Sequence, residues 1–406
     1  MYVANVETTH RREPNLTTRP ELNRRQWIAT TGAIVLASAT TSSYAIGQED
    51  KKQLQMLTSD PRNGQPKMED LIQSWITPVK HFYVRSHAPN PKIDPQKFRV
   101  RVEGKVRNPI ELSLHQLAQM KQIKTTATMT CAGNRRIEFN AEKEVGGVQW
   151  GAGAIGNANW SGVSLAEVLS SAEILEDARH VWFEGLDEIK RSDGIIPFGA
   201  SIPIEKAMIK TGPGTVLLCD QMNDQTLTPD HGYPLRTVVP GYIGARSVKW
   251  LGKIVVSDRP SPNHYVANAY KIVRGKSAMD WNEAGPIYRF PINAAVCSPS
   301  SGAKIKKGKT TISGYVLPTG VGGNKIDAVN VSIDGGKKWK KATIRNEQFD
   351  FCWNLWSVDF DVDQSVTQIL VRAQDTSGGF MPFRVPWNAK GYLQNSWFRS
   401  KLIVEN

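Results

Sequence analysis

Residues 131–136, with the sequence CAGNRR, constrain this chain more than any other segment. They follow the β-branched run 125–130, which predicts a strand that ends in a loop and holds a thiol at its end. Gly133 permits backbone angles that other residues avoid, and the two arginines favour the thiolate form of Cys131. Thiolates are soft metal ligands and guanidinium groups suit oxyanions, so the segment indicates a metal site for an anion. By itself it would also fit a loop around a buried structural cysteine.

Further segments, in the same order along the chain, resemble the sulfite oxidase family of molybdenum enzymes, in which the CAGNRR cysteine is the protein ligand of molybdenum. The resemblance runs from about Trp75 to the C-terminus and implies that Cys131 binds molybdenum. Residues 82–89 (FYVRSHAP) depart from the family pattern at Ser86, where asparagine is usual. The other segments that carry the resemblance are residues 147–150 (GVQW), 153–155 (GAI), 183–187 (FEGLD), 230–236 (DHGYPLR), 239–246 (VPGYIGAR), 248–251 (VKWL), 332–336 (SIDGG) and 395–399 (NSWFR).

The resemblance also implies roles for residues around the metal. Arg85 and Arg136 match the family's substrate arginines, Trp150 an indole of the substrate pocket, and Tyr270 a hydroxyl beside the metal centre. Lys390 stands where a third arginine is usual, which keeps the charge but loses the bidentate fork. The pterin cofactor and its phosphate are expected against Tyr83, Val84, Arg85, Ser86, His87, Asp187, His231, Arg236, Ser247, Val248 and Lys249.

The implied reaction is the oxidation of sulfite to sulfate at a molybdenum–molybdopterin cofactor, expected without an attached nucleotide. The chain has four cysteines and no CxxCH segment, so we expect no c-type haem in it. The segment before Trp75 is too short for a b5-type haem domain. An external c-type cytochrome is therefore the expected acceptor, which takes the electrons singly. Cys297 and Cys352 could pair, which the sequence leaves open.

Two other functions fit parts of the same pattern. A sulfane dehydrogenase subunit of a sulfur-oxidising complex has the same fold, although such subunits tend to have glycine where Arg135 stands. A non-catalytic secreted anion-binding protein would require Cys131 to be structural. Eukaryotic nitrate reductases carry fused haem and flavin modules, and bacterial methionine sulfoxide reductases of this superfamily usually lack CAGNRR, so both fit less well.

The formal net charge of +13 would suit a nucleic acid, an acidic membrane surface or an anionic substrate. The lysines are dispersed apart from residues 304–309 and 337–341, and no nucleic-acid motif accompanies them. We therefore expect no nucleic acid, and we interpret the two lysine clusters as solvated loop tips, with docking to an acidic redox protein as the alternative.

The N-terminal region predicts export. Residues 23–28 (NRRQWI) precede a mildly apolar stretch that ends at Ser43-Tyr44-Ala45, a small-x-small cleavage pattern. We interpret residues 1–45 as a twin-arginine signal and expect a periplasmic protein. The stretch contains too many Thr, Ser and Gly residues to predict a stable membrane span.

We predict an α+β architecture in two domains after a polar linker over residues 46–74. Residues 75–288 should form a mixed sulfite-oxidase-type molybdopterin domain, because strand patterns there do not alternate regularly with the helical patterns near 112–117 and 165–175. Residues 289–406 show short strands separated by turn signals, which predicts an all-β immunoglobulin-like sandwich. In the family this second domain forms the homodimer interface.

Overall fold

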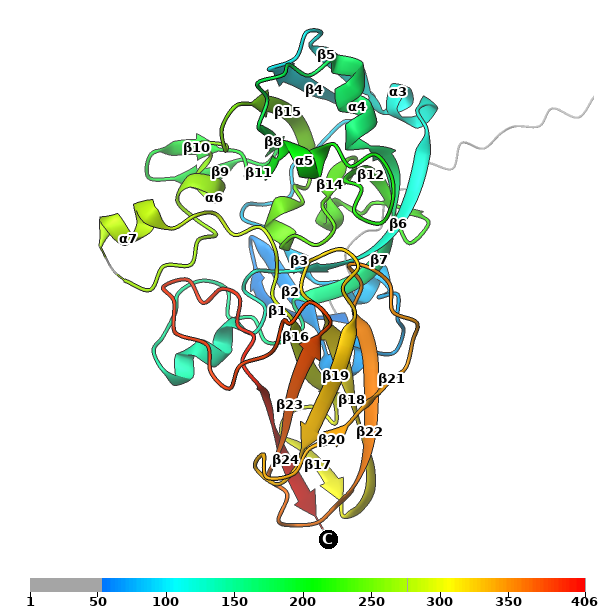
Figure 1. Cartoon of the computed structure of the whole chain (residues 1–406). Coiled ribbons are helices and arrows are strands. Elements are labelled where there is room, and N and C mark those ends of the chain that lie inside the picture. The colour runs from blue at the N-terminus through cyan, green and yellow to red at the C-terminus, as the bar shows by residue number, and fades with distance from the viewer. Residues whose placement is uncertain (1–52, 276, 406) are drawn as a thin grey trace, which may run out of the picture. The chain divides into compact units, whose positions relative to one another are not determined.

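The computed structural model describes residues 53–275 and 277–405 (Figure 1). These residues belong to a single compact unit. The predicted twin-arginine signal over residues 1–45 lies outside them. Within the described ranges, no helix is long and apolar enough to cross a membrane.

The described part of the chain begins with a β-hairpin, which lies before Trp75, where the first domain was expected to begin. Strands β1 (Leu54–Ser59) and β2 (Arg62–Pro66) pair antiparallel, and β2 also pairs with β3 (Val84–Arg85), with Asn63 opposite Arg85. The short helix α2 (Met68–Leu71) then buries Leu71. The prediction of a polar linker over 46–74 is therefore wrong for this stretch. Its polar residues Asn63 and Gln65 are buried with hydrogen-bond partners, a form of burial that a hydropathy pattern does not reveal.

The first large sheet has the strand order β11-β8-β15-β4-β5, in which β15 is parallel to β4 and antiparallel to β8. Its residues Val100, Val102, Val181, Phe183 and Ile254 are buried in the main core. The strands are β4 (Arg99–Gly104), β5 (Ile110–Ser113), β8 (His180–Gly185), β11 (Gly199–Pro203) and β15 (Leu251–Ser257).

The second sheet is antiparallel, in the order β13-β12-β7-β6, with β14 paired to β12. The strand predicted before Cys131 is confirmed as the last residues of β6, which ends at Thr130. The strands are β6 (Gln122–Thr130), β7 (Ile155–Ser164), β12 (Leu217–Met222), β13 (Gln225–Thr226) and β14 (Arg236–Val238).

The helices of this part are short, as an α+β architecture requires. A capping box at Ser113 and Gln116 begins α3 (Leu114–Gln119). The helix predicted near 165–175 is α4 (Leu165–Ala172), which stops at Glu173 because that residue is left-handed with φ of 54°. The remaining small elements are η1 (Val79–His81), η2 (Arg136–Ala141), β9 (Ile189–Arg191), β10 (Gly194–Ile196), α5 (Ile204–Ala207), η3 (Pro229–His231), η4 (Gly244–Arg246), α6 (His264–Ala267) and α7 (Ala278–Glu283).

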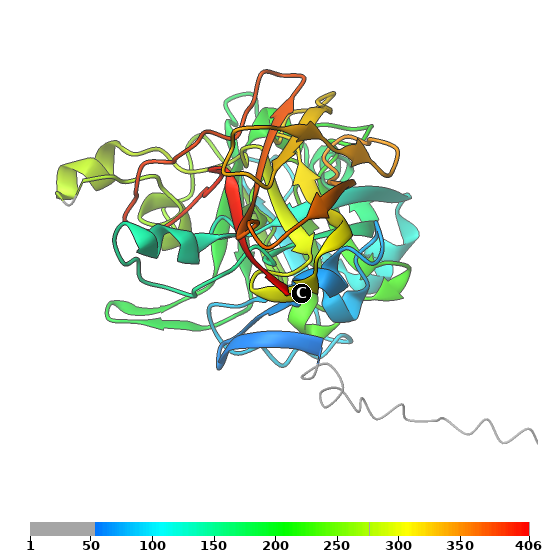
Figure 2. The same ribbon diagram turned by 90° about the horizontal axis from the view of Figure 1, so that it is seen from below.

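The C-terminal part is all-β and consists of two sheets that pack on each other through β16, β23 and β24. Seen from below, its strands in yellow, orange and red lie together (Figure 2). One sheet has the order β16 (Asn293–Ser298), β18 (Gly308–Leu317), β22 (Asn354–Val362) and β21 (Thr343–Ile344). The other has the order β17 (Ala303–Lys306), β24 (Phe398–Glu405), β23 (Gln368–Asp375), β19 (Ile326–Ser332) and β20 (Lys340–Lys341).

The C-terminal sheets are bonded to the strand that carries the thiol loop. Trp75 and Trp353 each donate an indole N–H to the other's carbonyl oxygen, at 3.0 and 2.9 Å. The Thr128 hydroxyl of β6 accepts from the Trp353 amide at 2.8 Å. Cys297 and Cys352, whose pairing the sequence left open, are separate buried thiols.

Candidate functional site

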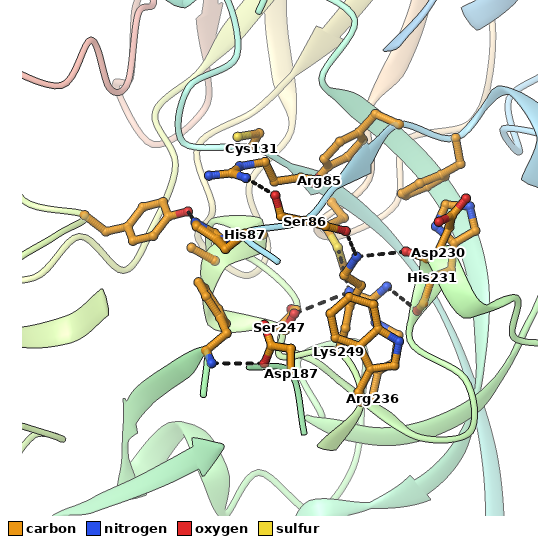
Figure 3. A pocket seen from close by; sticks show the side chains of 18 residues that line it. Arg85, Ser86, His87, Cys131, Asp187, Asp230, His231, Arg236, Ser247 and Lys249 are labelled. Carbon is orange, nitrogen blue, oxygen red and sulfur yellow. Dashed lines mark hydrogen bonds between the residues drawn. The ribbon is translucent and has the colours of Figure 1, made fainter. Parts of the chain in front are cut away.

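A pocket lies between β3, the end of β6 and the loops that lead into β15 (Figure 3). Its walls come from segments far apart in the sequence, including most of the residues expected around a cofactor. The lining residues are Phe82, Tyr83, Arg85, Ser86, His87, Met129, Cys131, Asp187, Phe198, Asp230, His231, Arg236, Gly244, Ala245, Ser247, Lys249, Trp250 and Tyr270.

Cys131 is held at the end of β6 by backbone bonds. Its amide donates to the Ala154 carbonyl oxygen at 2.9 Å, and its Sγ accepts from the Gly133 amide at 3.4 Å. A Cβ at Gly133 would lie 2.7 Å from Arg136 Nη2 and 3.2 Å from Trp150 Cδ1, so only glycine lets the loop turn this closely. The loop therefore presents a nearly buried thiol to the pocket on a rigid support.

Arg85 reaches the same end of the pocket from β3. Its Nη1 donates to Asn63 Oδ1 at 3.1 Å and to the Ser86 carbonyl oxygen. Among the hydrogen bonds of the described residues, none uses its Nε or Nη2. A substrate oxyanion could accept from these two nitrogens.

Two cations, the buried Arg236 and the half-buried Lys249, lie together at another wall of the pocket. Lys249 Nζ donates to Ser86 Oγ at 2.8 Å and to the Asp230 carbonyl oxygen at 2.9 Å. Arg236 donates Nη1 to the His231 carbonyl oxygen at 2.9 Å and places Nη2 3.2 Å from Met129 Sδ. Within the part of the chain that the structure describes, neither cation has a carboxylate within ion-pair distance. Burial lowers the pKa of Arg236 to about 10, and burial together with the Arg236 charge lowers that of Lys249 to about 7.

His87 and Tyr270 form a neutral pair on a third wall. The Tyr270 hydroxyl and His87 Nε2 are 3.0 Å apart, and the imidazole stacks on Phe198 with ring centroids 4.6 Å apart. Burial and the nearby Arg85 charge keep the pKa of His87 well below its usual value, and burial raises that of Tyr270. Both groups are therefore uncharged near neutral pH, and a hydrogen bond joins them within the pocket.

Asp187 and His231 occupy opposite sides of the remaining space. The Asp187 carboxylate accepts from the Phe198 amide at 3.0 Å, and burial raises its pKa. Burial lowers the pKa of His231 to about 4, so its imidazole is neutral. A carboxylate acceptor and a neutral imidazole suit the amino and ring nitrogens of a pterin.

Five of the residues expected at the site do not line the pocket. Val84 and Val248 are buried and do not line the pocket, whereas the residues on either side of them, Tyr83, Arg85, Ser247 and Lys249, do. The other three are Arg136, Trp150 and Lys390.

Arg136, Trp150 and Lys390 are held outside the pocket by neighbouring groups. Arg136 donates Nε to the Lys390 carbonyl oxygen and Nη1 to that of Val148, both at 2.9 Å. Trp150 is fully buried edge-on to Tyr83. The Lys390 side chain is exposed, with Nζ 5.4 Å from the centre of the Trp281 ring. These three side chains do not line this pocket, and their expected contacts with the substrate stay predictions.

Several pocket residues were missed by sequence reasoning. Asp230 and Trp250 lie within segments quoted for the resemblance, so their motif neighbours were a usable signal. Met129, the residue two before Cys131, is a β6 side chain on the same side as the thiol. Phe198 and Asn63 had no signal in the sequence, because only tertiary contacts bring them to the site.

Comparison with known families agrees with this geometry. The model described as the oxidoreductase molybdopterin binding domain matches residues 87–265. The model described as the Mo-co oxidoreductase dimerisation domain matches residues 284–405. The first match contains Cys131 and most of the pocket wall.

Individual proteins similar to this chain include sulfite oxidases and a sulfane dehydrogenase. Sulfite oxidase of Arabidopsis thaliana is 36% identical over 383 residues, which cover 88% of this chain and 96% of that protein. Mitochondrial sulfite oxidase of Drosophila melanogaster is 35% identical over 363 residues, or 85% of this chain, but the chain spans only 62% of its length. In the crystal structure of the sulfane dehydrogenase SoxCD from Paracoccus pantotrophus, one chain superposes with a TM-score of 0.74 at 24% identity, over 94% of this chain and 97% of that one. At this identity the likeness shows the fold.

The residues present fit a molybdenum cofactor. Cys131, a soft ligand in its thiolate form, lies in the same pocket as Arg236 and Lys249. The described residues leave the charges of these two cations without a carboxylate partner, so both are available to bind a phosphate. A Cβ at Gly232 would lie 3.1 Å from the Cβ atoms of both cations, so the loop approaches them at a glycine. The chain belongs to the sulfite oxidase family of molybdenum oxidoreductases.

Proposed function

We propose that this protein is a sulfite dehydrogenase, which converts sulfite and water to sulfate, two protons and two electrons. The observation that carries the proposal is a single pocket that contains the Cys131 thiol, the Arg85 guanidinium and two cations without carboxylate partners. Such a pocket suits a small oxyanion beside a thiolate-bound metal.

Each group of pocket residues has its own proposed role. When bound, the molybdenum cofactor supplies the two-electron redox chemistry. Cys131 would hold the metal, and Arg236 and Lys249 would bind the phosphate of the pterin. Arg85 would bind and orient the oxygens of sulfite, so that the sulfur lone pair faces the reacting centre. The His87–Tyr270 pair would keep a neutral hydroxyl donor beside the substrate, which costs no extra charge in a buried site.

The finer features belong to the same proposal. The cofactor carries no attached nucleotide, the protein works in the periplasm after twin-arginine export, and a c-type cytochrome accepts its electrons one at a time. The two C-terminal sheets form an immunoglobulin-like module through which two copies associate. The family match of residues 284–405 to a dimerisation domain supports this association.

The test measures molybdenum content and sulfite-dependent reduction of ferricyanide and of a c-type cytochrome on one preparation of the exported protein. About one molybdenum per chain with rapid sulfite turnover is the expected result. Molybdenum without sulfite turnover, but with oxidation of a sulfane substrate, would favour the sulfane dehydrogenase alternative. A folded, exported protein without molybdenum would favour an anion-binding protein. Light scattering on the same sample measures the expected dimer.

A further inference from the structure

The β1–β2 hairpin lies outside both stretches matched by the family models. Two of its residues bond to residues that line the pocket, and a third bonds to the loop that follows Trp150. We propose that this hairpin positions the substrate end of the pocket and that Asn63 is the positioning residue for Arg85. The inference rests on the proposed function, because it assigns Arg85 to the binding of sulfite.

Asn63 uses all four hydrogen-bonding positions of its side chain. Its Oδ1 accepts from Arg85 Nη1 at 3.1 Å and from the Ser86 amide at 3.0 Å. Its Nδ2 donates to Thr58 Oγ1 at 2.8 Å and to the Pro61 carbonyl oxygen at 3.0 Å. With 1% of its surface exposed, the carboxamide cannot turn without leaving buried groups unpaired. The hairpin turn thus fixes the amide, and the amide fixes one nitrogen of Arg85.

This contact sets the direction of the guanidinium. Nη1 is occupied by Asn63 and by the Ser86 carbonyl oxygen, and Nε and Nη2 remain for an oxyanion. An arginine side chain has several rotatable bonds, so holding it before the substrate arrives lowers the entropic cost of binding. Antiparallel pairing of β2 with β3 supports the same arrangement, because it places Asn63 directly opposite Arg85.

Two further residues of the hairpin, Arg62 and Gln65, bond to two other segments. Arg62 forms an ion pair with the Asp230 carboxylate, whose backbone carbonyl oxygen accepts from Lys249. Gln65 Oε1 accepts from the Gly151 amide at 3.0 Å, in the loop that follows Trp150. The hairpin therefore connects the phosphate-binding wall, the Arg85 strand and the loop behind the thiol.

The experiment is a double-mutant cycle on the full-length, molybdenum-loaded enzyme, with Asn63→Ala, Arg85→Ala and the double variant. We expect Asn63→Ala to raise the KM for sulfite and the inhibition constant of sulfate about tenfold, while kcat changes less than about twofold. In the Arg85→Ala background the same substitution should change either constant less than about twofold. Gln55→Ala, an exposed glutamine on the same hairpin, is the matched control and should behave as the wild type.

Three outcomes would overturn the inference. In the first, Asn63→Ala changes the KM and the inhibition constant equally with and without Arg85. In the second, kcat and the molybdenum content fall while the KM stays unchanged. In the third, the inhibition constant of sulfate does not change. If Asn63→Ala does not fold, Asn63→Asp places a carboxylate against Arg85 Nη1. This charge should compete with sulfite for the guanidinium and raise the KM, and the increase should disappear in the Arg85→Ala background. A loaded wild type that binds sulfate but does not oxidise sulfite would contradict the proposed function alone, because the cycle of sulfate affinities would still test Asn63.

Discussion

Arg135 and Glu138 form a two-point ion pair, with Nε to Oε1 and Nη2 to Oε2 both at 2.7 Å. The Arg135 side chain is fully buried and also donates to Asn293 Oδ1 and to the Ser396 carbonyl oxygen, each at 2.9 Å. Although it stands four residues after the thiol, it faces the C-terminal sheets and does not line the pocket. Arg135 therefore anchors the thiol loop to the C-terminal part of the chain, and its presence says little about which substrate the pocket binds.

We expect Arg135→Gly to destabilise the protein by about 3 kcal/mol, because it leaves Glu138 without its partner and Asn293 without a donor. Glycine suits the left-handed backbone there, with φ of 67°, so the loss would come from the side chain alone. Chemical denaturation measures it. Arg107→Gly, which removes an exposed arginine 4.0 Å from Glu173, is the control and should have little effect. Equal losses for the two variants would contradict the anchoring role.

Cys131→Ser should abolish molybdenum binding or lower sulfite turnover by more than about 100-fold, since a hydroxyl is a poor ligand for a soft metal. The fold should remain, because within the described residues the thiol accepts a single hydrogen bond, from the Gly133 amide. Metal analysis and circular dichroism on the same sample measure both effects. Cys297→Ala removes a buried thiol of β16, away from the pocket, and should keep metal and turnover. Substantial turnover by Cys131→Ser would refute the ligand assignment.

Lys390→Ala should change the KM for sulfite by less than about fivefold, because its exposed amine packs on Trp281 and does not line the pocket. Arg85→Ala, which removes a pocket guanidinium, should raise the KM by about 10- to 100-fold. Steady-state kinetics compares the two variants directly. If the two KM values rise equally, Lys390 enters the pocket when sulfite binds, and the sequence-based role for it would be correct.

The part of the site that the sequence predicts is the part carried by contiguous segments. Cys131 follows the strand predicted over residues 125–130, and the motif identified Ser247 and Lys249, although it also assigned Val248 to the pocket. The C-terminal sheets follow from regularly spaced turn signals.

The remainder depends on contacts between distant segments. Asn63 acquires its role only when β2 pairs with β3, and its burial depends on hydrogen bonds that hydropathy does not register. Arg136 and Lys390 lie on loops, where neighbouring carbonyl oxygens and rings decide the side-chain direction. Motif matching does not reveal these tertiary contacts, so the substrate roles of the two residues stay predictions.

The affinity of the cofactor-free protein for an anion should depend on pH through Lys249. Burial and the Arg236 charge lower the pKa of Lys249 to about 7, from 10.5 in an exposed lysine. The folded protein therefore loses this charge as the pH rises through about 7, while the unfolded chain keeps it. The lysine's contribution to the free energy of unfolding is therefore present at alkaline pH and is lost as the pH falls through about 7. An anion needs the charged lysine, so the affinity for an anion should fall as the pH rises. Sulfate is a suitable probe because its own charge is constant in this range.

We expect sulfate to bind about tenfold more tightly at about pH 6 than at about pH 8, measured by calorimetry on cofactor-free protein. Lys249→Met should bind weakly at both values, and Lys249→Arg should bind well at both, because a guanidinium stays charged. An unchanged pH dependence in Lys249→Met would assign the titration to another group. Phosphate is unsuitable here, since its second ionisation falls in the same range and would oppose the effect of the lysine.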